Sequence, residues 1–127
     1  MIPIYGSMSR PENPEEGLQE LINGRLTWKG GELKITLATD EFTSLCPTTG
    51  QPDFSSIEII YEPNEFYLES KTVKFYLWSF RDQGAHCESL ADKVCNDVVA
   101  AIAPRSCIVR VSQEPRGGIA IVSEARR

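Results

Sequence analysis

The sequence has a single histidine, His86, and its four cysteines form no Cys-x-x-Cys pair. Because a zinc site needs three or four ligands within tetrahedral reach, a Cys/His site here would consist mostly of cysteine. No apolar run approaches the roughly 18 residues that a membrane-spanning helix requires. No Gly-x-Gly-x-x-Gly follows a predicted strand either. We therefore expect no metal, no membrane contact and no Rossmann-type dinucleotide site.

Positive charge is also scarce, since 13 Lys and Arg stand against 18 Asp and Glu, a formal net charge of −5. Proteins that bind the phosphate backbone of nucleic acids usually present a basic surface, so we expect no nucleic-acid partner. A small anionic ligand held by a few local cations remains compatible with this charge. The first residues lack the basic start and apolar stretch of a signal peptide, which predicts a cytoplasmic protein with free thiols.

The length of 127 residues favours one domain, residues 1–127. Residues 1–25 are rich in Pro, Glu, Asn and Gly, and they predict an extended or loosely packed arm with a short helix near 18–22. Alternating apolar residues predict the strands, and apolar residues at helical spacing predict two helices. The predicted strands are 32–37, 56–61, 106–112 and 118–123, and the predicted helices are 70–80, capped by Ser70, and 87–102, ended by Pro104.

The order of these elements is strand, strand, helix, helix, strand, strand. Hairpins at both ends predict an α+β fold, in which a four-stranded antiparallel sheet carries a helix pair on one face. Such an open sheet has two bare edges. We therefore expect subunits to join edge to edge in a symmetric oligomer, with sites between them.

The segment FTSLCPTTGQPDF, residues 42–54, contains the most specific chemistry. By itself it fits a buried thiol in a turn as well as a nucleophile, Cys46, with Asp53 as its proton partner. Together with ESKTVKFY (69–76), Leu77-x-Ser79-Phe80-Arg81, Asn96-Asp97 and PRGGI (115–119), it resembles the NADPH-dependent 7-cyano-7-deazaguanine reductases, the QueF nitrile reductases of queuosine biosynthesis. The resemblance covers roughly residues 32–122 in collinear order, and the chain is similar to the short, single-module branch.

The resemblance implies the tunnelling fold, whose subunits join their sheets into a barrel, here a homo-oligomer of stacked rings similar to a decamer. It implies reduction of the nitrile to a primary amine with two NADPH. The resemblance also assigns roles to individual residues: Cys46 as the nucleophile that forms a thioimide, Asp53 as proton donor, Glu88, Glu69 and Ser70 in substrate binding, and Lys71, Lys74 and Arg116 at the cofactor. Lys71 and Lys74 lie three apart on a predicted helix, so they share a face and suit phosphate groups.

The chain departs from the family at His86-Cys87-Glu88, where the usual order is Phe-His-Glu. One residue near a helix start turns a side chain by about 100°, so either Cys87 fills the position of the family histidine or His86 reaches the site from a remodelled loop. We also expect that Cys87 could lie near Cys46 across a subunit interface and form a reversible disulfide with it.

The sequence argues against three other functions. The related amidinotransferase of archaeosine formation acts on tRNA without NADPH, and the segment 69–76 and the acidic charge argue against it. A zinc-dependent pterin enzyme such as GTP cyclohydrolase is disfavoured by the single histidine. A non-enzymatic assembly module would make the combination of Cys46, Asp53 and Glu88 a coincidence.

Overall fold

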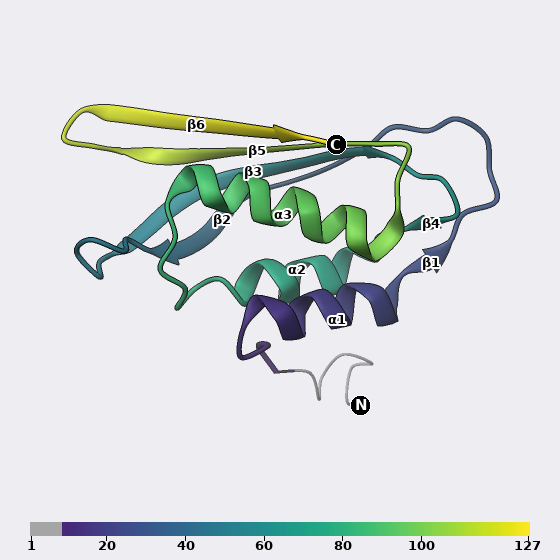
Figure 1. The fold of residues 1–127 in the computed structure, drawn as a ribbon, viewed down its shortest axis with the longest axis horizontal. Helices are drawn as coiled ribbons and strands as arrows, with labels where there is room; N and C mark the ends of the chain where they lie inside the picture. The colour runs from purple at the N-terminus through teal and green to yellow at the C-terminus, as the bar shows by residue number, and fades with distance from the viewer. Residues whose placement is uncertain (1–8) are drawn as a thin grey trace.

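The computed structural model describes residues 9–127, which form three helices and two antiparallel sheets (Figure 1). The N-terminal part of the expected arm, residues 1–8, lies outside the described residues. In chain order the elements are α1 (Pro14–Gly24), β1 (Leu26–Thr27), β2 (Ile35–Leu45), β3 (Pro52–Glu62), β4 (Phe66–Tyr67), α2 (Ser70–Trp78), α3 (Cys87–Ile102), β5 (Ser106–Arg116) and β6 (Ile119–Arg126).

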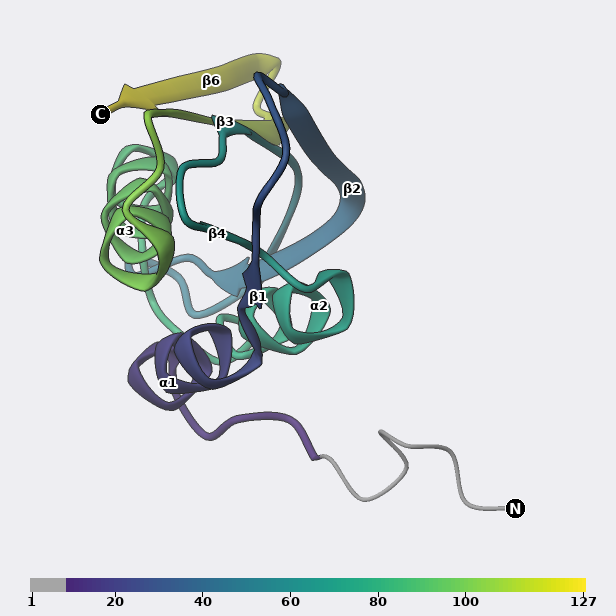
Figure 2. The same cartoon turned by 90° about the vertical axis from the view of Figure 1, so that its right-hand side faces the viewer.

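The main sheet has the strand order β2-β3-β5-β6, and every neighbouring pair is antiparallel. The helices cover one face of it, and the sheet curls so that β2 comes down beside α2 (Figure 2). The predicted α+β fold is therefore confirmed, with strands that run several residues longer than predicted. Among residues 9–127, no helix is both long and apolar enough to cross a bilayer.

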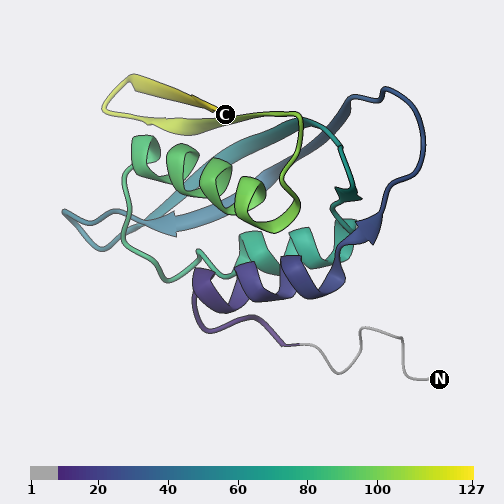
Figure 3. The same ribbon diagram turned by 45° about the vertical axis from the view of Figure 1, so that its right-hand side comes forward.

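The N-terminal segment differs from the expected loose arm. Asn13 caps α1 by accepting a hydrogen bond from the backbone N–H of Glu16 at 2.9 Å, and Pro14 occupies the first turn, where its missing N–H costs nothing. Leu21 is buried in the core. The helix thus lies beside α2 (Figure 3), and it begins four residues before the predicted start because Pro14 initiates it instead of interrupting it.

The start of α2 corrects a second expectation. Glu69, not Ser70, is the N-cap: its carboxylate accepts hydrogen bonds from the N–H groups of Lys71 and Thr72, both at 3.0 Å. The carboxylate satisfies two free N–H groups and carries a negative charge at the positive end of the helix dipole. Ser70 is the first helical residue and is exposed. A glutamate cap is uncommon, which is why the more usual Ser70 was predicted.

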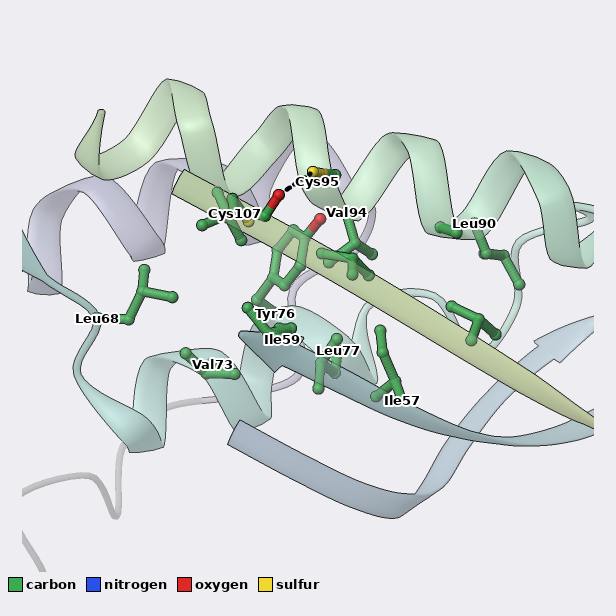
Figure 4. Packing of buried hydrophobic residues seen from close by; sticks show 14 of the residues in the cluster. Ile57, Ile59, Leu68, Val73, Tyr76, Leu77, Leu90, Val94, Cys95 and Cys107 are labelled. Atoms are coloured by element: carbon green, nitrogen blue, oxygen red, sulfur yellow. Dashed lines mark hydrogen bonds between the residues drawn. The ribbon is translucent and has the colours of Figure 1, made fainter. Parts of the chain in front are cut away.

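The core lies between the helices and the sheet (Figure 4). The apolar stripes predicted for both helices are buried there. One polar pair lies within it: the Tyr76 hydroxyl donates to Asp97 at 2.7 Å, and Lys93 contacts the other oxygen of this carboxylate at 3.1 Å. Asp97, part of the recognised Asn96-Asp97 motif, therefore joins α2 to α3 within the core.

Strand β2 contains one extra residue. Thr39 pairs with Ile57, whereas Phe42 pairs with Ser55, so residues 40–41 of β2 stand opposite a single residue of β3. Because side chains alternate between the faces of a sheet, one extra residue moves every later side chain to the opposite face. Phe42 therefore shares the helix-covered face with the buried Ser55.

Strand β5 contains a second bulge of the same kind. Gln113 pairs with Ile121, but Arg116 pairs with Ile119, so residues 114–115 stand opposite one residue of β6. Gln113 also pairs with the buried Ser55 of β3, which puts it on the helix-covered face. The extra residue keeps Arg116 on that same face, where regular alternation would have turned it away.

Candidate active site

The segment that contains Cys46 is the tight connection between β2 and β3. The N–H of Cys46 donates to the carbonyl of Gln51 and the N–H of Gly50 donates to the carbonyl of Cys46, both at 2.8 Å. Gly50 has a φ of +72°, a left-handed conformation that glycine adopts readily. The bulge in β2 places Phe42 and Ser44 on the helix-covered face, and Cys46 is the next position in this alternation. The loop therefore holds a half-buried thiol at the edge of the covered face.

Hydrogen bonds within this loop lower the pKa of Cys46 to about 7. The side chain of Thr49 contributes most, followed by the backbone N–H groups of Thr49 and Thr48, while burial and the carboxylate of Asp53 act in the opposite direction. A thiol with this pKa is substantially ionised at neutral pH, and the thiolate is the nucleophilic form. Sequence reasoning missed both threonines, although the Cys-Pro-Thr-Thr-Gly turn predicts that they fold back on the cysteine.

Asp53 lies directly opposite Ser44 in the β2–β3 ladder, and only 5% of its side chain is exposed. The predicted proximity of Asp53 and Cys46 is thus present, since Asp53 acts electrostatically on the thiol. The charged partner of Asp53 is Arg116, whose guanidinium contacts the Asp53 Oδ1 and also donates a hydrogen bond to the carbonyl of Pro52 at 2.9 Å. The expected phosphate-binding arginine therefore lies beside the expected proton donor.

The connection between α2 and α3 packs beside the Cys46 loop. The N–H of Leu45 donates to the carbonyl of Gln83 at 2.9 Å, and the N–H of Ala85 donates to the carbonyl of Leu45 at 3.1 Å. This contact brings the start of α3 to the end of the molecule where the two hairpin tips also lie (Figure 1). His86 is the N-cap residue of α3, is exposed and makes no side-chain capping bond.

Cys87 does not face the site. It is 1% exposed, and its sulfur lies 3.5 Å from the carbonyl of Val111, beneath the sheet. The expected Cys46–Cys87 disulfide across an interface is therefore wrong for this structure, because a sulfur in the core cannot meet another subunit while α3 stays packed. The one-residue shift in the motif turns the cysteine inward and leaves His86 outside.

Glu88 belongs to a groove on the β6 side of α3. It is exposed and lines a groove of about 500 Å³ between α3 and β6, together with Arg126 and Arg127. Strand β6 is the edge of the sheet opposite β2, the strand that leads to Cys46. Glu88 therefore does not line the groove between α2 and β2, although α3 begins beside the Cys46 loop.

A larger groove, of about 900 Å³, runs between α2 and β2. It combines aromatic side chains, including Phe54 and Trp78, with the cations Lys74 and Arg81, and Ser70 also lines it. Lys71 is exposed and is not among the lining residues. Of the three predicted cofactor residues, Lys74 therefore lies in the groove, Arg116 contacts Asp53, and Lys71 lies on the same helix outside the groove. Over residues 9–127, no three His, Cys, Asp or Glu side chains are grouped as metal ligands.

Known proteins resemble this chain along most of its length. The family described as QueF-like protein matches residues 52–127. The NADPH-dependent 7-cyano-7-deazaguanine reductase of Anaeromyxobacter dehalogenans (strain 2CP-C) is 43% identical over 116 residues, 91% of this chain and 93% of the relative. The reductase of the same name from Syntrophus aciditrophicus (strain SB) is 48% identical over 91 residues, 72% of this chain and 65% of the relative.

Among solved structures, an apo crystal structure of the archaeosine synthase QueF-Like superimposes with a TM-score of 0.67 at 21% identity, covering 78% of this chain and 95% of that one. At this identity the likeness establishes the fold only. The reductases, in contrast, share close to half of their residues with this chain in the aligned regions. The chain therefore belongs to the QueF-like family, that of the NADPH-dependent 7-cyano-7-deazaguanine reductases.

Proposed function

We propose that this protein reduces 7-cyano-7-deazaguanine to 7-aminomethyl-7-deazaguanine with two NADPH, as a nitrile oxidoreductase of queuosine biosynthesis. The observation that carries the proposal is Cys46: a half-buried thiol whose pKa is lowered to about 7, on a tight loop beside a buried carboxylate. A merely structural cysteine would sit in the core with a raised pKa, as Cys95 and Cys107 do.

The chemistry starts with the sulfur of Cys46. A nitrile carbon accepts hydride poorly, and addition of the thiolate converts it into a thioimide that accepts hydride more readily. The nitrile nitrogen gains a proton as the carbon–sulfur bond forms, and Asp53 is the group placed to supply it. His86 is exposed at the start of α3, next to this end of the molecule, and a role for it in proton transfer stays a prediction.

The groove between α2 and β2 suits the cofactor. NADPH supplies hydride, and it presents an adenine ring and a dihydronicotinamide ring joined through phosphates. Aromatic surfaces such as Phe54 and Trp78 can pack against rings, and Lys74 can neutralise a phosphate. Lys71, one turn earlier on α2, is proposed as a second phosphate contact. The expected phosphate contact of Arg116 also stays a prediction, although Asp53 occupies its guanidinium in this structure.

Substrate recognition is proposed for Glu88, with Glu69 and Ser70. A carboxylate can accept two N–H donors from the edge of a deazaguanine in a bidentate arrangement. Glu69 already accepts two backbone N–H groups, so it would bind substrate with its remaining lone pairs. Glu88 lies in the groove along the edge strand β6, so we expect residues of a neighbouring subunit to complete the substrate site there.

Edge-to-edge assembly would supply those residues. In the described chain β2 and β6 each have one edge without a partner strand, and both are long. Unpaired edges favour pairing with another chain. We propose a homo-oligomeric barrel of ring-stacked, decamer-like form, built from a single reductase domain of residues 1–127. It would work in the cytoplasm on a free small molecule, without nucleic acid or membrane.

Intact-mass measurement tests the proposal directly. The protein is mixed with 7-cyano-7-deazaguanine without cofactor, and NADPH is then added while its absorbance is followed. We expect a covalent adduct that Cys46→Ala abolishes, and two NADPH consumed per nitrile. An adduct without NADPH consumption would favour an amidinotransferase, and absence of any adduct would favour a binding role.

A further inference from the structure

Asp53 has an unusual setting for a group that is to donate a proton. Its side chain is 5% exposed, and the Arg116 guanidinium lies against its Oδ1. A buried carboxylate is unfavourable without a counter-charge, and a guanidinium in contact stabilises the ionised form. The other polar neighbour opposite Asp53 is Ser44, which carries no charge. The contact with Arg116 therefore gives this buried side chain a positive counter-charge.

A bulge in β5 and the tight turn that follows it bring Arg116 to Asp53. Arg116 follows the bulge at residues 114–115, and Gly117 and Gly118, with φ values of +57° and +80°, close the hairpin directly after it. Both glycines adopt the left-handed backbone that a two-residue hairpin turn of this type requires. Without the extra residue in β5, the side chain of Arg116 would lie on the uncovered face, away from Asp53.

We propose that Arg116 is a positioning residue for the proton transfer at Cys46: it holds Asp53 as a carboxylate in the site, ready to accept the thiol proton. The inference rests on the proposed function, and it gives Arg116 a different role from the phosphate contact implied by the family resemblance. Arg116 acts through Asp53 and need not touch the substrate.

The proton that the addition step needs then comes from Cys46 and stays within the site. The Cys46 S–H bond breaks and its proton passes to the Asp53 carboxylate. The sulfur forms a bond to the nitrile carbon, and the electron pair of one carbon–nitrogen π bond moves to the nitrogen. The Asp53 carboxyl returns the proton to that nitrogen, which regenerates the carboxylate beside Arg116. No other acid, base or oxidant is consumed.

This scheme requires one proton shared between Cys46 and Asp53. Below a certain pH both groups are protonated, and adduct formation declines. The charged or titratable groups recorded as acting on or contacting Asp53 in the described residues are Cys46 from the loop and Arg116 from β5. Removing the positive charge of Arg116 stabilises the protonated carboxyl, so the acidic limb of the pH profile moves to higher pH.

The test compares wild-type protein, Arg116→Gln and Arg116→Lys in the rate of adduct formation with 7-cyano-7-deazaguanine, without NADPH, across a series of pH values. Arg105→Gln is the matched control, since Arg105 adjoins Glu62 at the other end of β3. We expect the acidic limb of Arg116→Gln to move up by about one pH unit or more. Arg116→Lys should restore part of the shift, and Arg105→Gln should follow the wild type.

An unshifted acidic limb in Arg116→Gln overturns the role of Arg116, even if the rate falls uniformly. A raised KM for NADPH with unchanged cofactor-free adduct formation also overturns it, in favour of the phosphate contact. If the wild type forms no adduct at any pH, the proposed function itself fails. Should Arg116→Gln not fold, the ¹³C resonance of the Asp53 carboxyl in the wild type decides, because a protonated Asp53 at neutral pH contradicts the proposal.

Discussion

The Thr49 side chain donates a hydrogen bond to the sulfur of Cys46, and this bond is the largest cause of the lowered pKa of the thiol. In Thr49→Val the hydroxyl is lost, while a side chain of similar shape remains. We expect the pKa of Cys46 to rise, because the bond stabilises the thiolate more than the thiol. Iodoacetamide labelling of Cys46, followed by mass spectrometry across a pH series, should show its midpoint moved to higher pH.

Thr48→Val is the matched control, since Thr48 acts on the sulfur through its backbone N–H, which the substitution retains. Its labelling profile should superimpose on that of the wild type. Equal shifts in the two variants would mean that the loop conformation, and not the Thr49 hydroxyl, sets the pKa of Cys46.

Asp53→Asn should change the alkylation of Cys46 and its addition to the nitrile in opposite directions. The Asp53 carboxylate raises the pKa of Cys46, so its loss lowers that pKa and makes alkylation at neutral pH faster. The amide cannot carry the proton, so adduct formation with 7-cyano-7-deazaguanine should fall by roughly 10²-fold or more. If both reactions slow together, the substitution has damaged the loop, and the assignment of Asp53 as proton carrier loses its support.

Glu69→Ala removes the carboxylate that caps α2. Two N–H groups then lose their acceptor, and we expect the free energy of unfolding to fall by about 1 kcal/mol. Urea titration followed by circular dichroism measures this change. Ser70→Ala should have much less effect, because Ser70 lies after the cap; the reverse order would restore Ser70 as the capping residue.

The stability of the protein should depend on Cys107 at alkaline pH. Burial raises the pKa of Cys107 from 9.0 to about 12. The folded state therefore keeps its proton as pH rises above 9.0, whereas the unfolded state releases it, and stability falls progressively until the pH passes the folded value.

Thermal unfolding at a series of alkaline pH values, with Cys107→Ala beside the wild type, checks the contribution of Cys107. The variant is expected to be less stable throughout, because a buried side chain is truncated. Its loss of stability between neutral and alkaline pH should nevertheless be smaller than that of the wild type. Parallel curves would assign the alkaline loss to other groups.

Periodicity predicted most of the fold. The apolar stripes of α2 and α3 are buried as expected, and each predicted strand of the main sheet lies within or overlaps an observed strand. The main error was in the N-terminal segment, where Pro14 and Gly17 suggested interruption. In the structure Pro14 lies in the first turn of a helix that packs on α2, which depends on tertiary contacts that local propensity does not include.

The site was predictable in part. Cys46 and Asp53 were found because their segment is long and specific, and the structure places them close together. The Arg116–Asp53 contact was not predicted, because it depends on a bulge that shifts the register by one residue. Likewise, the inward turn of Cys87 follows from where α3 begins, and a single position in the sequence does not reveal which way a helix is rotated.

The two bulges have a consequence for how this chain tolerates changes in length. Residues 40–41 and 114–115 include exposed positions, where insertions and deletions are usually harmless. Deleting one residue at either place could leave the strand pairing intact, yet every side chain from there to the adjoining hairpin tip would change face. A shortened β2 would carry the thiol to the uncovered surface, and a shortened β5 would carry the guanidinium there. The number of residues in these two short stretches therefore matters to the reaction as much as their identity.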